Sequence, residues 1–579
     1  MKSREQELLE FVYGGGVGRA AARQLSRLIA TSFARLEPPH SLPTDGLARD
    51  LPLSQDDVFL ITYGDQFGES GVPPLRTLAK FAGRYLAGTV SGLHILPFCP
   101  ATSDDGFSVS DYAAVDPALG GWEEIEGIAS SLRLMADLVL NHCSSSHAWF
   151  KGYLAGDTRY KDYFITVPPT TDLSAVARPR ALPLLTAFPT ARGTEHVWTT
   201  FSADQVDLNY ADPEVLLEMI RVLFGYVRHG VQVVRLDAIA YLWKEIGHPC
   251  IHHPKTHAVV KLLRALFKRY APWVVLITET NVSHKENLSY FGDGTDEAQM
   301  VYQFALPPLV LDAFLREDAG HLREWASALP PAGGATTYFN FLASHDGVGL
   351  LPAQGFLSDG ELAQLIESVR ARGGLVSYKA TPGGEIPYEL NISYRDAIAE
   401  EGLDTESRAR KFLASQAILL SLAGVPGIYV HSLIGSGNYQ RGVELTGRSR
   451  SINREKLSYG ELEAELKQPG TLRNLIFEGF GRMLRSRRRP AFHPAGNQVV
   501  LPADRALFVV QRTAPDGSDS VLCVINTGGR SATLAVARHF SKDLIGGKAL
   551  TAPEGGGLRR VTLAPWQAVW LARDAGGQA

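Results

Sequence analysis

The stretch VQVVRLDAIAY, residues Val231–Tyr241, decides the fold. Its valines and first leucine form a β-branched apolar run that is too short for a helix, and His229-Gly230 before it is a typical helix stop. The run therefore predicts a buried strand. Arg235 and Asp237 are two residues apart, so both side chains point to the same face of that strand. A charged pair at the end of a buried strand indicates either a structural ion pair or a functional site.

Further apolar segments along the chain alternate with helical patterns, which predicts a parallel sheet. Together they make eight strands, the number that closes a (β/α)8 TIM barrel. We expect these strands at residues 58–64, 92–98, 134–142, 231–239, 274–280, 300–308, 336–346 and 425–431. The clearest helices are expected at 214–228, 256–270 and 409–422.

Two connections are too long for a plain barrel loop, and the chain closes with short apolar segments typical of antiparallel strands. The predicted fold class is therefore α/β: a TIM barrel with a small inserted domain after the third strand, a second insertion after the seventh, and a C-terminal antiparallel β domain. The predicted boundaries are an N-terminal helical extension at 1–56, the barrel at 57–142, 212–348 and 409–490, insertions at 143–211 and 349–408, and the β domain at 491–579.

Two segments within these units, one helical and one basic, also need an interpretation. Residues 1–45 carry two helical patterns, which we expect to brace the barrel. The run SRRRP at 486–490 is expected to be a solvated helix end, because arginines are favourable at helix C-termini.

Composition is that of a soluble globular protein, with 579 residues, 45% hydrophobic and 20% charged residues, and a net charge of −4. This balance argues against nucleic-acid and anionic-membrane partners. The N-terminal residues MKSREQELLE lack an apolar signal core, and no segment is long enough for a membrane span. The four cysteines, with no paired spacing, fit a reducing compartment, so we expect a cytoplasmic protein.

Two more carboxylates lie at the carboxyl ends of later predicted strands. Glu279 ends VVLITET, and Asp346 ends TTYFNFLASHD. The carboxyl ends of barrel strands share one face, where active sites are built, so these two groups and Asp237 are expected to meet. Three carboxylates brought together repel one another, which favours a chemical role over a structural one.

The chain from about Asp57 onward resembles the sucrose phosphorylase-like branch of the α-amylase superfamily of glycoside hydrolases. The resemblance rests on LITYGDQFG, GLHILPFCPATSDDGFSVSDY, DLVLNH, TTFSADQVDLNY, VVRLDAIAY, LITETN, VYQFALPPLVL, ASHDGVGL and SRSINR. Within that branch, ITETNVSHKENLSYFGDGTDEAQMVYQF and WKEIGHPCIHHPKTH look more like the glucosylglycerate phosphorylases. The resemblance implies a retaining enzyme that cleaves 2-O-α-glucosylglycerate with phosphate into α-glucose 1-phosphate and glycerate.

The resemblance assigns Asp237 as nucleophile, Glu279 as acid/base and Asp346 as a stabiliser of the transition state. A cation beside Asp237 is expected to lower its pKa, whereas the surroundings of Glu279 are expected to raise its pKa. The implied glucose-binding residues are Asp104, Phe107 as a stacking platform, His142, Gln205, Arg235, His345 and Arg450. A bidentate Asp104–Arg450 pair is expected to close the pocket to one sugar unit.

A phosphorylase must bring phosphate, and not water, to the glucosyl-enzyme intermediate, so its entrance needs donors for a dianion. The resemblance points to Arg178 and Arg180 in ARPRALP, and to Tyr388 and Glu389 in PYELN, for phosphate and the acceptor. Arg180 is the first candidate for the acceptor's carboxylate. Glu389 departs from sucrose phosphorylases, in which a glutamine is expected to touch fructose. The alternative for the PYELN segment is a rigid Pro-rich surface turn.

Other functions stay open at this point. Sucrose, sucrose 6′-phosphate and glucosylglycerol phosphorylases are alternatives, as is a non-catalytic sugar-binding barrel. The expected partners are a glucoside and inorganic phosphate, and the relatives suggest a homodimer. No cofactor and no metal are expected: the spacing of His248, Cys250, His252, His253 and His257 matches no closed zinc site, and no acidic loop for calcium is evident.

Overall fold

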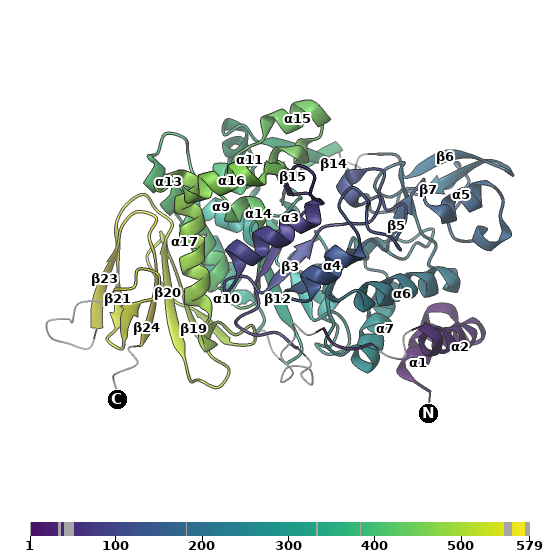
Figure 1. Ribbon diagram of the computed structural model, residues 1–579, viewed down its shortest axis with the longest axis horizontal. Helices are drawn as coiled ribbons and strands as arrows, with labels where there is room; N and C mark the ends of the chain where they lie inside the picture. The colour runs from purple at the N-terminus through teal and green to yellow at the C-terminus, as the bar shows by residue number, and fades with distance from the viewer. Residues whose placement is uncertain are drawn as a thin grey trace.

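The computed structural model describes residues 2–32, 36–39, 51–180, 182–331, 334–381, 384–548 and 558–573. In this part of the chain, eight parallel strands close a barrel in the order β1-β16-β12-β11-β10-β9-β4-β3, which confirms the predicted fold class (Figure 1). The strands are β1 (Phe59–Thr62), β3 (Gly92–Ile95), β4 (Arg133–Leu138), β9 (Val231–Leu236), β10 (Val275–Thr278), β11 (Met300–Tyr302), β12 (Thr337–Phe341) and β16 (Val425–Tyr429).

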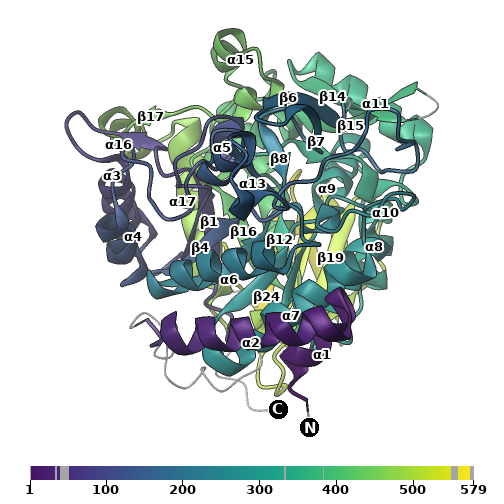
Figure 2. The same ribbon diagram turned by 90° about the vertical axis from the view of Figure 1, so that its right-hand side faces the viewer.

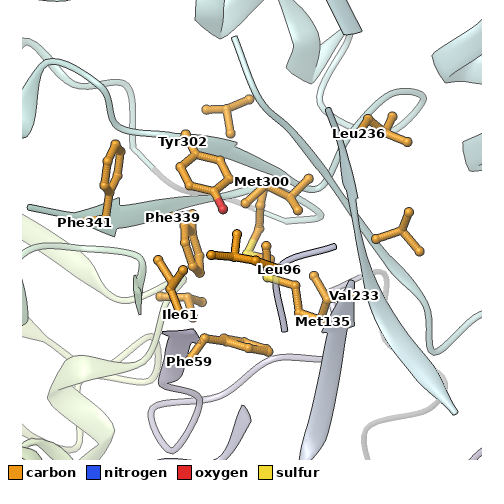
Figure 3. Close-up of a cluster of buried hydrophobic side chains, with 14 of the residues drawn as sticks. Phe59, Ile61, Leu96, Met135, Val233, Leu236, Met300, Tyr302, Phe339 and Phe341 are labelled. Carbon is orange, nitrogen blue, oxygen red and sulfur yellow. The ribbon is translucent and has the colours of Figure 1, made fainter. Parts of the chain in front are cut away.

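Large apolar side chains from several strands fill the barrel interior (Figure 3). Two glycines make room for the largest rings. A Cβ on Gly92 would lie 2.4 Å from the ring of Phe59, and one on Gly427 would lie 2.4 Å from the ring of Phe339. The interior is therefore a packed core, and substrates can enter only at its ends.

Helices surround the barrel and begin with the caps that their sequences supply. Asp212 caps α6 by accepting a hydrogen bond from the Glu214 backbone, and Pro213 occupies the first turn. The three expected helices are confirmed as α6 (Pro213–Arg228), α7 (Pro254–Tyr270) and α13 (Thr405–Ser421). The other principal barrel helices are α3 (Pro74–Phe81), α4 (Trp122–Ala129), α8 (His284–Leu288), α9 (Leu306–Arg316), α10 (Gly320–Ala328), α14 (Val430–Leu433), α16 (Tyr459–Lys467) and α17 (Leu472–Arg487).

Every predicted strand extended too far at its carboxyl end, and these boundaries were wrong. The seventh strand ends at Phe341, five residues before Asp346, and the sixth ends at Tyr302. Most of the residues that follow the strands are buried like the strand residues, so burial does not mark where a strand ends. Backbone conformation does: Ala238, two residues beyond β9, has φ 49° and cannot continue a strand.

Both long connections carry structure of their own near the carboxyl end of the barrel. The first contains β5 (His142–Ser144), α5 (Ala148–Leu154), β6 (Leu185–Thr190), β7 (Gly193–Trp198) and β8 (Gln205–Asp207). The second contains β13 (Val348–Gly349), α11 (Asp359–Ala371), β14 (Leu375–Thr381), β15 (Gly384–Asn391) and α12 (Tyr394–Ile398). The tip of its Gly- and Pro-rich turn, residues 382–383, lies outside the described residues.

The C-terminal part is an antiparallel β domain that packs against α13 (Figure 1), and Ser486 on α17 donates a hydrogen bond to the Leu544 carbonyl. Its sheets have the orders β18-β19-β20-β24-β22 and β21-β23. The strands are β18 (Asn497–Val500), β19 (Leu507–Thr513), β20 (Ser520–Asn526), β21 (Ala532–Ala537), β22 (Phe540–Asp543), β23 (Leu558–Leu563) and β24 (Ala568–Arg573).

The predicted solvated helix end at SRRRP was wrong for Arg487, which is only 1% exposed. Its guanidinium donates hydrogen bonds to the backbone carbonyls of Gln55, Leu420, Gly424 and Phe492. These carbonyls belong to the chain before β1, the end of α13, the approach to β16 and the start of the β domain. Four hydrogen bonds to buried carbonyls therefore replace the water that would otherwise solvate this arginine.

The N-terminal helices α1 (Arg4–Tyr13) and α2 (Gly15–Ser32) pack beside α6 and α7 (Figure 2). Leu9 and Leu25 are 1% and 2% exposed there, so this part of the extension braces the barrel as expected. The rest of the extension, at 33–35 and 40–50, lies outside the described residues. A search of the described helices finds none that combines the length and the apolar character of a membrane span.

Candidate active site

The three predicted carboxylates lie together at the carboxyl end of the barrel. Asp237 directly follows β9, Glu279 directly follows β10, and Asp346 lies in the loop after β12. All three line one inner cavity of about 90 Å³. This inner cavity shares Arg180 and Arg450, among other residues, with a larger outer cavity of about 610 Å³.

Arg235 is the centre of the buried charge network beneath the inner cavity. Its Nη1 lies 2.7 Å from Asp237 Oδ1 and also contacts Asp137, which in turn contacts His94 at 2.7 Å. Its Nη2 is 3.8 Å from Glu279 Oε1. The network fixes the guanidinium against the floor of the site, closer to Asp237 than to Glu279.

Burial and the carboxylates around it raise the pKa of Asp237, against the opposing effect of Arg235. Arg235 lowers the pKa of Asp237 as expected, but the expected low pKa was wrong, because desolvation is the larger effect. Burial also raises the pKa of Glu279, as expected. Arg235 is closer to Asp237 than to Glu279 by about 1 Å, so its charge favours ionisation of Asp237 more strongly than ionisation of Glu279.

The surroundings of Asp346 lower its pKa, in contrast to those of Asp237 and Glu279. Burial alone would raise its pKa, but the guanidinium groups of Arg450, at 2.5 Å, and Arg454, at 3.9 Å, hold the pKa of Asp346 well below its usual range. Burial lowers the pKa of His345 to about 3, so the imidazole is neutral at pH 7. Asp346 is therefore the carboxylate of the three that is most firmly ionised.

The expected Asp104–Arg450 pair was wrong. The guanidinium of Arg450 makes its bidentate contact with Glu389, through Nε–Oε2 at 3.0 Å and Nη2–Oε1 at 2.9 Å. Asp104 instead accepts hydrogen bonds from Gln205 at 3.1 Å and from Arg180 at 3.3 Å. The sequence could not show that Glu389, on β15, reaches Arg450 first.

The other predicted glucose-binding residues line the inner cavity as expected. His142 Nε2 is 3.0 Å from the Phe107 carbonyl oxygen and 3.2 Å from Gln205 Nε2. The ring of Phe107 stacks on the imidazole of His345, with centroids 4.9 Å apart. Phe107 therefore supports His345 and at the same time walls the cavity.

The two arginines predicted to bind phosphate differ in their position relative to the cavities. Arg180 lines both cavities, pairs with Asp104 and lies over the ring of Phe201. Arg178 lines neither cavity and donates to the backbone carbonyl of Leu182 in its own loop. Arg178 therefore shapes the loop that presents Arg180.

Several residues of this region were missed by the sequence reasoning. The backbone N–H of Ala238 donates to Glu279 Oε2 at 3.0 Å. Arg454 lines the outer cavity, contacts Asp105 and donates to the carbonyl of His345 at 2.8 Å. Asn281 Nδ2 donates to Tyr388 Oη at 3.2 Å. The SRSINR motif could have pointed to Arg454, whereas the other two contacts depend on loop geometry.

The histidine- and cysteine-rich segment makes separate local contacts. His257 Nδ1 is 2.9 Å from Glu297, and His252 Nδ1 is 3.0 Å from the Tyr290 hydroxyl. His253 caps the start of α7. Within the described ranges, no group of three or more His, Cys, Asp or Glu side chains is arranged to hold a metal ion.

The chain is similar in sequence to known proteins over most of its length. Residues 85–346 match the family model "Alpha amylase, catalytic domain". A glucosylglycerate phosphorylase from Spirochaeta thermophila is 58% identical over 524 residues, 90% of this chain and 89% of the relative. One from Escherichia coli is 42% identical over 574 residues, 99% of this chain and 100% of the relative.

A solved structure supports the fold. Sucrose 6F-phosphate phosphorylase from Thermoanaerobacter thermosaccharolyticum matches with a TM-score of 0.72 and 24% identity, over 82% of this chain and 94% of that one. High identity to curated relatives over nearly the whole chain, together with the barrel and its carboxylates, establishes the family. The chain belongs to the glucosylglycerate phosphorylases of the α-amylase superfamily.

Proposed function

We propose that this protein is a retaining phosphorylase that converts 2-O-α-glucosylglycerate and phosphate into α-glucose 1-phosphate and glycerate. The observation that carries the proposal is a cavity in which three carboxylates meet below an entrance lined by arginines. Similarity to named phosphorylases over at least 90% of this chain supports the same activity.

In the first half-reaction, Asp237 would attack the anomeric carbon while Glu279 protonates the glycosidic oxygen. The bond to glycerate breaks as the bond to Asp237 Oδ forms, and the product is a β-glucosyl ester. The closer approach of Arg235 to Asp237 supports this division of roles, because the nucleophile must be ionised and the acid protonated. Asp346, kept ionised by Arg450, would stabilise the positive charge that develops on the sugar.

In the second half-reaction, an oxygen of phosphate would attack the same carbon from the other face. Glu279, now a carboxylate, takes the proton, and the ester to Asp237 breaks. Two inversions leave the α-configuration unchanged. Arg180 lies where the two cavities meet, so its charge would attract phosphate toward the glucosyl-enzyme.

Both leaving group and attacking group are anions, and one set of donors can serve both. In 2-O-α-glucosylglycerate the carboxylate is bonded to the carbon that carries the glycosidic oxygen. When a phosphate oxygen replaces the glycosidic oxygen, the remaining phosphate oxygens therefore fall close to the position that the carboxylate has left. Arg180 would bind each anion in turn, which fits its exposure to both cavities.

The test is to measure glucose 1-phosphate and glucose released from glucosylglycerate, with and without phosphate. The proposal expects glucose 1-phosphate that depends on phosphate, and little glucose. Equal release of glucose in both conditions would identify a hydrolase.

A screen of glycerate, fructose, fructose 6-phosphate and glycerol as acceptors, with glucose 1-phosphate as donor, tests the choice of substrate. A homodimer stays a prediction, for which light scattering is the measurement.

A further inference from the structure

A hydrogen bond joins the loop that carries the acid/base to the hairpin that covers the site. Asn281 follows Glu279 by two residues, and its Nδ2 donates to the hydroxyl of Tyr388 on β15 at 3.2 Å. Both side chains line the inner cavity, and Tyr388 also lines the outer one. The pair therefore lies on the path of any group that approaches the glucosyl-enzyme.

The hydroxyl of Tyr388 has one proton that it can donate to a ligand. Burial raises the pKa of Tyr388 well above its usual range, so the phenol is neutral. Its oxygen accepts from Asn281, and among the described residues no acceptor takes its O–H. Because the oxygen of this neutral phenol already accepts a hydrogen bond, its O–H is oriented to donate to another group.

The amide of Asn281 is itself closely held. A Cβ on Gly349 would lie 2.6 Å from Asn281 Oδ1 and 2.8 Å from Nδ2, so only glycine leaves space for this amide. Its Oδ1 is buried and has no hydrogen-bond partner among the described residues. Packing on Gly349 thus limits the rotation of the amide and fixes the direction from which it reaches Tyr388.

We propose that Asn281 is a positioning residue that directs the Tyr388 hydroxyl proton toward the anion of each half-reaction, phosphate or the carboxylate of the acceptor. The inference rests on the proposed function and adds to it the residue that orients Tyr388, which the resemblance already assigns to phosphate. Asn281 acts through its hydrogen bond to Tyr388.

A double-mutant cycle tests this role. Tyr388→Phe removes the proton, and the KM for phosphate is expected to rise roughly 10- to 100-fold, the effect of losing a hydrogen bond to a charged group. Asn281→Ala is expected to raise the same KM several-fold, and the product ratio should shift from glucose 1-phosphate toward glucose. In the Tyr388→Phe background, Asn281→Ala should add nothing further. Additive effects of the two substitutions would overturn the proposal.

A matched control separates positioning from loosening of the hairpin. Asn391 also lies on β15, and its Nδ2 donates to Ser377 on β14 at 2.9 Å, but it lines neither cavity. If Asn391→Ala shifts the product ratio as much as Asn281→Ala, the role of Asn281 is only structural and the inference fails. The proposed function itself is tested on the unsubstituted protein. If that protein forms no phosphate-dependent glucose 1-phosphate, the proposed function is wrong, and not only the role of Asn281.

Discussion

Glu389 holds Arg450 through two parallel hydrogen bonds of 3.0 and 2.9 Å. The same guanidinium reaches Asp346 at 2.5 Å, so one arginine connects the β14–β15 hairpin to the carboxylate at the floor of the site. Glu389 is 2% exposed, and water cannot replace it easily. We therefore expect position 389 to affect catalysis through the geometry of Arg450.

Glu389→Gln should lower kcat/KM for glucosylglycerate about 10- to 100-fold, because a charge-assisted bidentate pair becomes a weaker neutral contact. Steady-state phosphorolysis is the measurement. Glu385→Gln, at an exposed position of the same strand, is the control and should change little. Similar kinetics for both variants would contradict a role for the Glu389–Arg450 pair.

The main features of the fold and site could be predicted because they depend on local patterns. Apolar strands alternating with helices predict a barrel, and Asp237, Glu279 and Asp346 each follow such a strand directly or after a short loop. Strand ends in a barrel converge, so the meeting of these three groups needed no knowledge of long-range contacts.

Pairings between distant loops could not be predicted in this way. Arg450 pairs with Glu389 across 61 positions of the chain, and Asn281 with Tyr388 across 107. Which partner an arginine reaches depends on the register of the β14–β15 hairpin and on loop conformation. Likewise, the burial of Arg487 depends on four carbonyls from separate segments.

Glu279→Gln should separate the two roles of the acid/base. With glucosylglycerate, loss of the proton donor should lower kcat about 10²- to 10⁴-fold. With α-glucosyl fluoride the first half-reaction should lose far less, because fluoride leaves with little protonation. Stopped-flow measurement of fluoride release compares the two substrates.

Asp237→Asn is the companion variant and should abolish the reaction of both substrates, since it removes the nucleophile. If Asp237→Asn still released fluoride and Glu279→Gln did not, the assignment of nucleophile and acid would be reversed.

The pH dependence of kcat/KM should be bell-shaped. Burial raises the pKa of Glu279, so its acid form persists to higher pH than for an exposed glutamate, and activity is lost as pH rises through that pKa. Activity is also lost as pH falls through the pKa of Asp237, which must be ionised. With α-glucosyl fluoride the first half-reaction should keep the acidic limb and lose the alkaline limb. An alkaline limb of equal size for fluoride release would assign it to another group.

The N-terminal helices should contribute to stability through buried leucines. Leu9 is 1% exposed on α1, which packs on α7. Leu9→Ala should destabilise the protein by about 2–5 kcal/mol, seen as a lower Tm in calorimetry. Phe11, 59% exposed on the same helix, provides the control substitution Phe11→Ala, for which little change is expected. Equal Tm values for all three proteins would mean that α1 does not brace the barrel.

Arg487 should be the arginine of α17 whose loss costs most stability. Arg487→Met keeps much of the side-chain volume but leaves the carbonyls of Gln55, Leu420 and Gly424 without their donor. Each unsatisfied buried carbonyl costs about 1–3 kcal/mol, so a loss of about 3 kcal/mol or more is expected. Arg485→Met, at an exposed position two residues earlier, is the matched control. Calorimetry should show a lower Tm for Arg487→Met than for Arg485→Met and the unsubstituted protein; equal Tm values would show that the hydrogen bonds of Arg487 do not stabilise the fold.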